Sequence, residues 1–473
     1  MPIDYEGDVP RLNQSLLGGL TEVGQPQYVR GNLQPGIVHI GTGAFHRAHQ
    51  AWYTEQILNS GDLRWGTVGV SLRSATVRDA LEPQDYLYTV ATADQDRFDL
   101  AIQGGLLRIV NSPEALLQMV VDPQVQIVTL TITEKGYADE SRRGVPALLA
   151  ESLLKRMHKN QPLTVISCDN LSENGRALAD RVMAHAQADR DSGLSSWIRD
   201  HVSFPSTMVD RITPATTAAD RQRIQDAAGY LDAAPVVCER FSQWVIEDRF
   251  ATDRPQWELA GAQLVSDVVP FEQVKLRVLN ATHSVLAYTG LLKGYEFIHD
   301  AVADTQLRDF ALQTLEHEIK PNIDVPEGLD IDDYIRGVLI RFANAAVPYK
   351  TMQVASDGSQ KMSQRIFPSL NDCWDRGLSA PRLEFVVCAW IRTLAGVADD
   401  GSPISYNDPG ADRIKNELAK CEGLQEQFAA AWRQLTSFDP LDEVMQTRLA
   451  ECYTRLAQKG VNASLRHERF FDR

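Results

Sequence analysis

Short apolar runs alternate with helix-compatible segments through the first half of the chain. The runs that are rich in β-branched residues are Ile37–Ile40, Gly66–Leu72, Val125–Thr133 and Leu163–Ser167. Strands that alternate with helices in this way are typical of a largely parallel, doubly wound sheet, because each crossover between parallel strands needs a helix. The pattern therefore predicts an α/β fold for this half.

The second half of the chain has a different spacing of apolar residues. The segment from residue 241 to 270 carries mixed signals, and beyond it stretches such as 307–315 and 416–435 have the spacing of amphipathic helices. A chain of 473 residues exceeds what one hydrophobic core usually serves. We therefore predict two domains, a cofactor domain at 1–270 and a mostly helical domain at 271–473, with the active site in the cleft between them.

Composition limits the classes of partner. The hydrophobic fraction of 44% and charged fraction of 23% are those of a soluble globular protein. The formal net charge of −16 argues against nucleic acid or an anionic membrane as partner, although a local basic pocket could still hold an acidic substrate. No apolar run has the length of a membrane span, and the first eight residues lack the features of a secretion signal.

The six cysteines are scattered and form no Cys-x-x-Cys pair, which favours reduced thiols in a cytoplasmic protein. His46 and His49 are three residues apart, but a third ligand with zinc spacing is not evident nearby. We therefore expect a cytoplasmic protein without a bound metal.

A Gly-x-Gly motif directly follows the first apolar run. Gly41 would permit a tight turn, and Gly43 would let a pyrophosphate approach the amides at a helix N-terminus. His46 stands where the usual fingerprint has its third glycine. The alternative is an ordinary glycine turn of an α/β protein. The cofactor-binding residues predicted here are Ile40, Gly41, Thr42, Gly43, Ala44, Phe45 and His46.

A second motif, at 275–284, places an amine, an amide and an imidazole in a stretch with helical apolar spacing. At about 100° per residue, Asn280 projects roughly 140° from Lys275 and His283 roughly 80°, so all three can line one side of an α-helix. Such a set suits proton transfer to or from a hydroxyl. An ordinary polar helix face is the alternative.

Together the two motifs resemble those of the polyol-specific long-chain dehydrogenases, the family that contains mannitol 2-dehydrogenase and fructuronate reductase. The resemblance covers nearly the whole chain. It also includes Thr131–Tyr137, Ser167–Leu171, Met208–Ile212, Gln243–Asp248 and Asp357–Lys361. It implies a Rossmann-type cofactor domain, a helical second domain and zinc-independent chemistry.

The resemblance also assigns roles. Lys275 matches the family's catalytic base, and Asn170 and Asn280 match the asparagines that donate to the reacting oxygen. His283 and Asp210 match a substrate-orienting imidazole and the carboxylate that helps to hold it. An Asx turn at Asn170 and a plain ion pair between Asp210 and Arg211 are the alternatives.

The resemblance favours NAD as the cofactor, with NADP left open. Some relatives carry an acidic pair just after a Leu-Arg-Ser, whereas here Leu72-Arg73-Ser74 is followed by no carboxylate before Asp79. Arg73 or Arg78 could therefore contact a 2′-phosphate or simply stay solvated.

Substrate choice depends on a few cations. Gln353 stands where mannitol dehydrogenases of the family tend to have an arginine, whereas Arg277 and Arg365 are as in fructuronate reductases, and Arg365 would form a cationic cluster with Lys361. Such cations would suit the carboxylate of a sugar acid, unless Arg277 and Arg365 make structural ion pairs. The expected reaction is the NAD-dependent interconversion of D-mannonate and D-fructuronate, and the alternative is a dehydrogenase of a neutral polyol such as mannitol or arabinitol.

A protein of another class, with the family's shape but no catalysis, would be expected to lack Lys275 or both asparagines, and all three are present. The expected partner is thus a small sugar acid or polyol. Many relatives are monomers, so a monomer is compatible with the resemblance.

Overall fold

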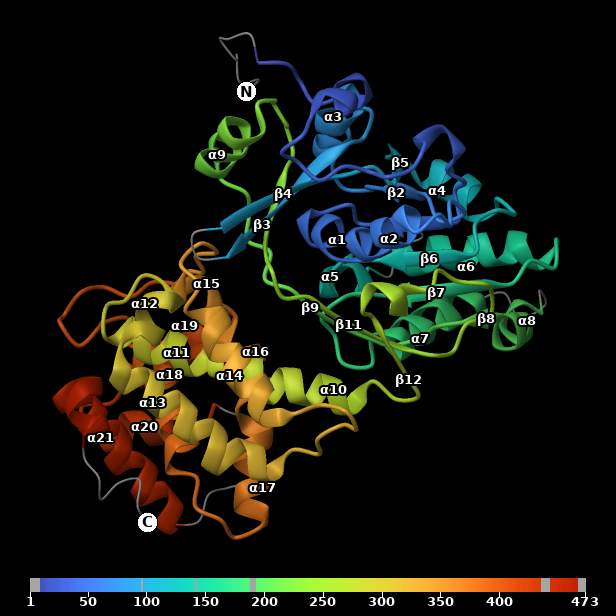
Figure 1. The fold of residues 1–473 in the computed structure, drawn as a ribbon. Helices are drawn as coiled ribbons and strands as arrows, with labels where there is room; N and C mark the ends of the chain where they lie inside the picture. The colour runs from blue at the N-terminus through green and yellow to red at the C-terminus, as the bar shows by residue number, and fades with distance from the viewer. Residues whose placement is uncertain are drawn as a thin grey trace. The chain divides into compact units, whose positions relative to one another are not determined.

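The computed structural model describes residues 9–94, 97–139, 141, 143–187, 193–434 and 443–466. The chain divides into two compact units, Met1–Val269 (unit 1) and Pro270–Arg473 (unit 2). Figure 1 shows the elements of both. Unit 1 is an α/β unit built on a parallel sheet, and unit 2 consists mostly of helices, as the sequence predicts.

The main sheet of unit 1 has six parallel strands in the order β5-β2-β1-β6-β7-β8. Two predicted strands have the expected bounds, and the other two are shorter because their flanking residues enter loops. The strands are β1 (Ile37–Ile40), β2 (Thr67–Val70), β5 (Leu106–Val110), β6 (Ile127–Leu130), β7 (Leu163–Ser167) and β8 (Val202–Ser203).

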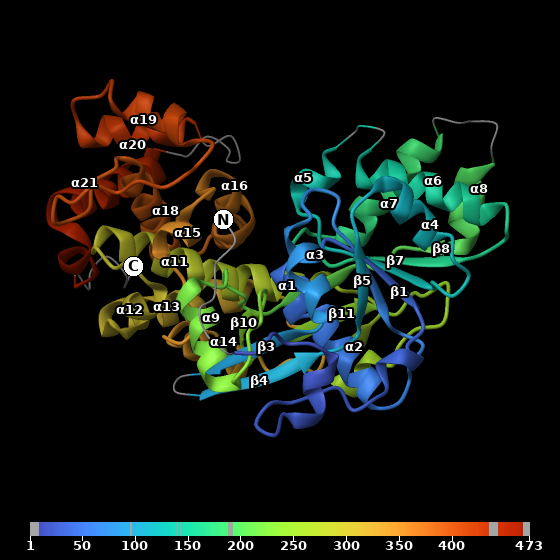
Figure 2. The ribbon, with the colours of Figure 1, turned by 90° about the horizontal axis from the view of Figure 1, so that it is seen from above.

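Helices cover both faces of this sheet (Figure 2). Val38 and Ile40 of β1 belong to the apolar cluster on one face, whereas Ile37 belongs to the cluster on the other, as the alternation of side chains along a strand requires. The first face is covered by α4 (Pro113–Val120), α6 (Val145–Met157), α7 (Asn174–Gln187) and α8 (Leu194–His201). The second face is covered by α2 (Gln50–Asn59), which follows the short α1 (Ala44–Ala48), and by a small sheet.

Two three-stranded sheets complete unit 1, and the apolar pattern alone does not predict them. One has the order β10-β3-β4, and the other, which packs on the main sheet, has the order β12-β11-β9. The strands are β3 (Tyr88–Asp94), β4 (Arg97–Gln103), β9 (Thr207–Asp210), β10 (Val236–Glu239), β11 (Gln243–Glu247) and β12 (Gln263–Val265). The remaining α-helices are α3 (Thr76–Leu81), α5 (Glu134–Tyr137) and α9 (Ala218–Ala228).

The register of the main sheet places the ends of four strands at one level. Ile40 pairs with Val70 and with Leu130, and Leu130 pairs with Ser167. The loops that follow β1, β2, β6 and β7 therefore emerge along the same edge. In open α/β sheets this carboxyl edge is where ligands bind.

Unit 2 is organised around one long helical segment. It begins as α10 (Val269–Val274), continues through a π-helical turn, η5 (Lys275–Asn280), and ends as α11 (Ala281–Leu292). Every residue of α11 is buried, because α12 (Ile298–Ala303), α13 (Thr305–Thr314), α15 (Thr351–Ala355) and α18 (Pro381–Leu394) pack around it. Such all-round burial is typical of a helix at the centre of a bundle.

The predicted helix at 307–315 corresponds to α13. The predicted helix at 416–435 is instead two helices in the described part, because Gly423 caps the start of the second. The other α-helices of unit 2 are α14 (Ile331–Phe342), α16 (Gly358–Arg365), α17 (Phe367–Asp375), α19 (Ala411–Leu418), α20 (Leu424–Trp432) and α21 (Glu443–Leu465). Within the described ranges, no helix combines the length and apolarity needed to cross a bilayer.

Candidate active site

The glycine turn after β1 needs its first glycine for the fold itself. Gly41 has a φ of +102°, a conformation that residues with a side chain rarely adopt. A Cβ atom at this position would lie 2.1 Å from the carbonyl oxygen of Thr131 in the loop after β6. Gly41 is therefore fixed by backbone conformation and by the close approach of a neighbouring strand end.

Gly43 has a different reason to be glycine. Its backbone is extended, with a φ of −69° and a ψ of −177°, which any residue can adopt. The nearest atom to an added Cβ would be the carbonyl oxygen of Gly41, at 4.0 Å. The space beside Gly43 is thus open, and α1, which starts here, has no side-chain cap on its first amides. Amides that face open space suit a phosphate group.

His46 fills the place of the usual third glycine by stacking on the sheet. Its ring lies 3.3 Å from that of His39 of β1, with 12° between the ring planes. His39 in turn hydrogen-bonds the hydroxyls of Thr129 and Thr131. Burial lowers the pKa of His39 to about 3 and holds the pKa of His46 well below its ordinary value, so both rings are neutral at pH 7. The flat stack of two neutral rings lets helix and strand pack without a third glycine.

Asn170 follows a carboxylate that ties two loops of the carboxyl edge together. Asp169 accepts hydrogen bonds from the backbone N–H of Ile132 (3.1 Å) and of Thr133 (2.7 Å), and from the hydroxyl of Tyr137 (2.9 Å). Asn170 itself is exposed. The sequence motifs contain Asp169 and Tyr137, but only the structure shows that a hydrogen bond joins them and that Asp169 connects the loops after β6 and β7.

Asp210 is the last residue of β9 and is 5% exposed. The neighbouring Arg211 directs its guanidinium elsewhere: Nε donates to the carbonyl oxygen of Glu239 at 3.0 Å, and Nη1 to that of Ala48. The guanidinium also lies 5.4 Å from the ring centre of Trp52. Arg211 thus connects the end of β9 to the ends of β10 and α1 within unit 1.

In unit 2, Lys275 and Asn280 are the two ends of the π-helical turn. The sequence-based angles assume an α-helix, and for this segment the assumption is wrong. In a π-helix each N–H bonds the carbonyl five residues earlier rather than four, so position i+5 moves towards the face of position i. The turn therefore brings Asn280 nearer to the face of Lys275 than the α-helical estimate. Turns of this kind occur frequently at functional sites.

Both residues are buried, Lys275 to 9% exposure and Asn280 to 7%. The side-chain nitrogen of Asn280 finds no hydrogen-bond acceptor within the described parts of the chain. A buried donor without a partner costs about 1–3 kcal/mol, and a catalytic role is one reason to keep such a group. Asn280 is thus suited to donate to an oxygen supplied from outside the chain.

His283 lies in an aromatic setting that the sequence motifs do not reveal. Its ring stacks on Phe342 of α14 at 4.1 Å, and Tyr349 lies 5.2 Å away. Burial raises the pKa of Tyr349, and the nearby charge of Arg365 partly offsets the rise. The next residue along the helix, Ser284, accepts a hydrogen bond from Nη1 of Arg365 at 3.3 Å. The α16 arginine is therefore placed next to His283.

Arg365 is half-buried and lacks an acidic partner in the described ranges. Burial lowers its pKa, and among the described residues the hydroxyls of Tyr288 and Tyr349 oppose this change. Lys361, on the preceding turn of α16, directs its ammonium towards the carbonyl oxygen of Val354 at 3.4 Å. A half-buried guanidinium without a carboxylate is a suitable place for an anionic ligand.

Arg277, which we predicted to bind substrate, is used by the fold. It pairs with Asp372 of α17 and donates to the carbonyl oxygen of Asn322 at 2.7 Å. These bonds hold the π-helical turn against the neighbouring helices. The geometry favours the structural ion pair over the substrate-binding role, so we leave Arg277 out of the proposed site.

The predicted cofactor residue Arg73 is exposed in the loop after β2, and residues Ile40 to Phe45 lie at or next to the glycine turn. That the protein binds no metal stays a prediction from the sequence. In the part of the chain that is described, no group of three or more His, Cys, Asp or Glu could hold a metal ion.

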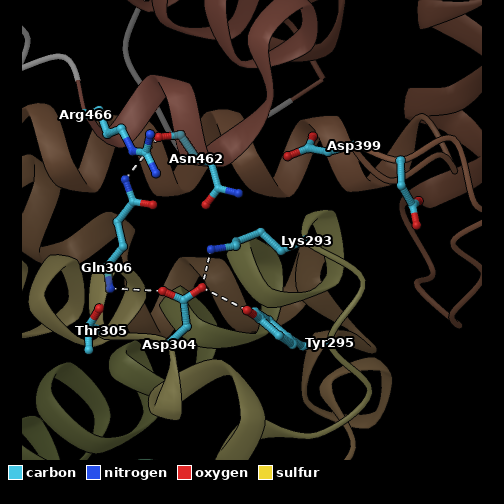
Figure 3. A pocket seen from close by; sticks show the side chains of 9 residues that line it. Lys293, Tyr295, Asp304, Thr305, Gln306, Asp399, Asn462 and Arg466 are labelled. Carbon is cyan, nitrogen blue, oxygen red and sulfur yellow. Dashed lines mark hydrogen bonds and ion pairs between the residues drawn. The ribbon is translucent and has the colours of Figure 1, made fainter.

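Unit 2 contains a second polar cluster, shown in Figure 3, that includes none of the predicted residues. It lines a hollow of about 610 Å³. Lys293 pairs with Asp304, which also accepts from the hydroxyl of Tyr295 at 2.9 Å and from the first amides of α13. Gln306 donates to the carbonyl oxygen of Asn462 at 3.0 Å. These bonds engage Lys293, Tyr295, Asp304 and Gln306 within unit 2, so we interpret the cluster as a structural one.

Comparison with known proteins identifies the family. The chain matches the family models of the mannitol dehydrogenase Rossmann domain over residues 35–259 and of the mannitol dehydrogenase C-terminal domain over residues 267–456. It is 39% identical to the D-mannonate oxidoreductase of Escherichia coli, over 86% of this chain and 91% of that protein. It is 33% identical to the mannitol 2-dehydrogenase of Pyrenophora tritici-repentis, over 87% and 78% of the two chains.

A solved structure shares the fold. The ternary complex of Pseudomonas fluorescens mannitol 2-dehydrogenase with NAD and D-mannitol superposes with a TM-score of 0.85 at 34% identity, and covers 97% of this chain and 99% of that one. The first family model lies within unit 1, and the second begins three residues before unit 2 and otherwise lies within it. The chain belongs to the mannitol dehydrogenase family and is an oxidoreductase that acts on CH–OH groups.

Proposed function

We propose that this protein interconverts D-mannonate and D-fructuronate with NAD as the cofactor. The observation that carries the proposal is Arg365, a half-buried guanidinium beside Ser284 and His283 without an acidic partner among the described residues. A sugar acid supplies the carboxylate that such a group binds best. The E. coli relative named D-mannonate oxidoreductase supports the same choice.

The glycine turn fits a dinucleotide. Gly43 leaves open space at the uncapped start of α1, which is where a pyrophosphate would receive hydrogen bonds from backbone amides. A solved relative contains NAD. When bound, NAD supplies the acceptor for the hydride that leaves the substrate carbon.

Proton movement is assigned to Lys275. In the direction of oxidation its amine accepts the proton of the substrate hydroxyl, and in the direction of reduction it returns the proton to the oxygen. The 9% exposure of this lysine supports the role, because a buried amine meets a bound substrate rather than bulk water.

Two asparagines are assigned to the reacting oxygen. The unpartnered side-chain nitrogen of Asn280 donates to it, and Asn170 provides a second donor by its match to the family motif. His283 is assigned to orient the substrate, and Asp210 keeps the role that its match to the family motif implies. The structure supports these roles to different degrees, and the observation on Asn280 is the most direct.

The alternative is a dehydrogenase of a neutral polyol. The specific observation in its favour is the likeness to a mannitol 2-dehydrogenase solved with D-mannitol. The two readings differ in what Arg365 does, since a neutral polyol has no carboxylate for it.

One assay separates the two readings. Purified protein is given NADH and, in parallel, fructuronate, fructose or tagaturonate, and the oxidation of NADH is followed by absorbance. We expect kcat/KM for fructuronate to exceed that for fructose by about ten- to a hundredfold, since a charge-assisted hydrogen bond contributes about 1.5–3 kcal/mol. Equal rates on fructose and fructuronate would contradict the sugar-acid proposal and favour the neutral-polyol reading.

The variant Arg365→Leu tests the assigned cation. It should remove most of the preference for fructuronate and change the weak rate on fructose little, because the neutral ketose has no charge to pair. Arg376→Leu is the control, since this exposed arginine of the same unit donates to Pro321 and Asn322 and has no role in the proposal. A preference that survives in Arg365→Leu would assign carboxylate binding to another residue.

A further inference from the structure

The loop after β2 differs from the usual dinucleotide-binding pattern in its charge. In that pattern an acidic residue at the end of the second strand bonds the ribose 2′-hydroxyl and repels a 2′-phosphate. Here β2 ends at Val70, and residues 71–78 contain two arginines and no carboxylate. The group that normally excludes NADP is missing from this loop.

The loop lies at the nucleotide end of the sheet. The N–H of Gly41 donates to the carbonyl oxygen of Val70 at 2.8 Å, and the hydroxyls of Thr42 and Ser71 are 2.5 Å apart. Asn111, which follows β5, donates to the carbonyl oxygens of Ser71 (2.9 Å) and Ser74 (3.2 Å). The loop is thus attached to the glycine turn on one side and to the end of β5 on the other. Leu72 and Arg73 lie between Ser71 and Ser74, and Leu72 packs against the apolar core of unit 1.

The two arginines of the loop differ in their ion pairing. Arg78 is paired with Asp79, with 2.6 Å between Nη2 and Oδ1. Arg73 is exposed and makes no ion pair within the described ranges. Asp139 is a carboxylate whose pKa is lowered mainly by hydrogen bonds from Ser141 and to a smaller degree by Arg73. The guanidinium of Arg73 is therefore available to an anion.

We propose that Arg73 binds the 2′-phosphate of NADP(H), so that this protein accepts NADP(H) as well as NAD(H). The inference rests on the proposed dinucleotide site and concerns only its selectivity. A phosphate monoester carries about two negative charges near neutral pH, and a guanidinium can bond two of its oxygens at once. Without a carboxylate in the loop, the 2′-phosphate also meets no repulsion there.

The experiment measures binding and therefore does not depend on turnover. NADH and NADPH are titrated into the purified full-length protein, and dissociation constants are obtained from calorimetry or from nucleotide fluorescence. We expect the two constants to lie within about tenfold of each other, because the contact with Arg73 offsets the cost of placing the phosphate. The relative affinity for NADPH should fall as salt is added, because an exposed ion pair is screened.

Two variants and one control locate the effect. Arg73→Gln should shift the NADPH-to-NADH selectivity about tenfold towards NADH. Ser74→Asp places a carboxylate in the loop and should shift it in the same direction by a similar factor, while its oxygen can still accept from the N–H of Thr76 as the serine does. Arg78→Gln is the matched control, since this arginine is already paired, and should leave the selectivity unchanged.

The outcomes are distinguishable. Binding of both nucleotides with the expected shifts supports the inference. Binding of NADH together with NADPH that is weaker by a hundredfold or more would overturn the inference and leave the proposed function intact. Failure of both nucleotides to bind would contradict the proposed function itself. Equal selectivity in the wild type and in Arg73→Gln would overturn the assignment to Arg73.

Discussion

The glycine turn of unit 1 and the π-helical turn of unit 2 present polar groups in opposite ways. The glycine turn offers backbone amides, and its two glycines remove side chains where the chain or a ligand must come close. The π-helical turn offers side chains, and its wider winding brings Asn280 towards Lys275. Backbone amides can only donate hydrogen bonds to a ligand, whereas a side chain such as the Lys275 amine can also accept a proton and return it. The glycine turn is therefore suited to cofactor binding, and the π-helical turn is suited to proton transfer.

The largest effect is expected at the proton carrier. Lys275→Ala should lower turnover by about two to four powers of ten, because the proton acceptor is lost, and should leave NADH affinity nearly unchanged. Steady-state kinetics over a range of pH and a nucleotide titration measure the two quantities. Turnover close to wild type at every pH would exclude Lys275 as the base.

A second lysine of the same segment provides the control. Lys293 follows α11 and pairs with Asp304 in the structural cluster of Figure 3. Lys293→Met should reduce the free energy of unfolding, because it breaks a largely buried pair, but should leave turnover within about twofold. A loss of turnover in both variants would mean that the assay reports folding rather than chemistry.

Asn280 extends the comparison, because its unpartnered amide is expected to lower the free energy of unfolding and to raise turnover. Asn280→Leu should lower turnover by about a hundredfold, the scale seen when one donor to a developing oxyanion is removed. Its free energy of unfolding should stay the same or rise, because a buried donor without a protein acceptor is replaced by an apolar group. Urea unfolding and kinetics on the same preparation test both. A marked loss of stability would indicate that the amide has a structural partner.

The two glycines of the turn should respond differently. Gly43→Val should weaken nucleotide binding by about ten- to a hundredfold at nearly wild-type stability, because the side chain fills the space of the pyrophosphate. Gly41→Ala should instead destabilise the fold by about 1–3 kcal/mol or more, because its φ is positive and Thr131 is in contact. Calorimetric titration and chemical unfolding separate the two effects. Unchanged nucleotide affinity in folded Gly43→Val would remove the turn from the cofactor site.

The smallest effect concerns the stacked histidines. The pKa of His39 is lowered from 6.5 to about 3 by burial, so the folded protein keeps this ring neutral while the unfolded chain protonates it. The stability contributed by the neutral ring is therefore fully present above pH 6.5 and is lost as the pH falls towards 3. His39→Gln should reduce the slope of unfolding free energy against pH in this window by about one proton. An unchanged slope would mean that His39 is charged in the fold.

Local patterns were sufficient to predict the family and four of the six strands of the main sheet, whereas β5 and β8 were not predicted. The apolar runs of β1 and β7 agree with the observed strands because buried parallel strands need continuous apolar residues. The sequence also indicated Gly41, Lys275 and Asn280 as site residues, which stay predictions, since glycine conformation and residue chemistry are properties of single positions. The small sheets were not predicted, because their strands pair with partners far away in the chain, such as Val236 with Val90.

The sequence alone determined which groups are available: the glycines, the lysine, the asparagines and a loop after β2 without a carboxylate. Tertiary structure decided which of them are in use. Arg277 and Arg365 look alike in the sequence, yet Arg277 is engaged by Asp372 and Arg365 has no such partner among the described residues. Likewise the π-helical turn changes the face of Asn280. Hydrogen bonds and ion pairs between distant segments decide these points, and residue spacing along the chain does not contain them.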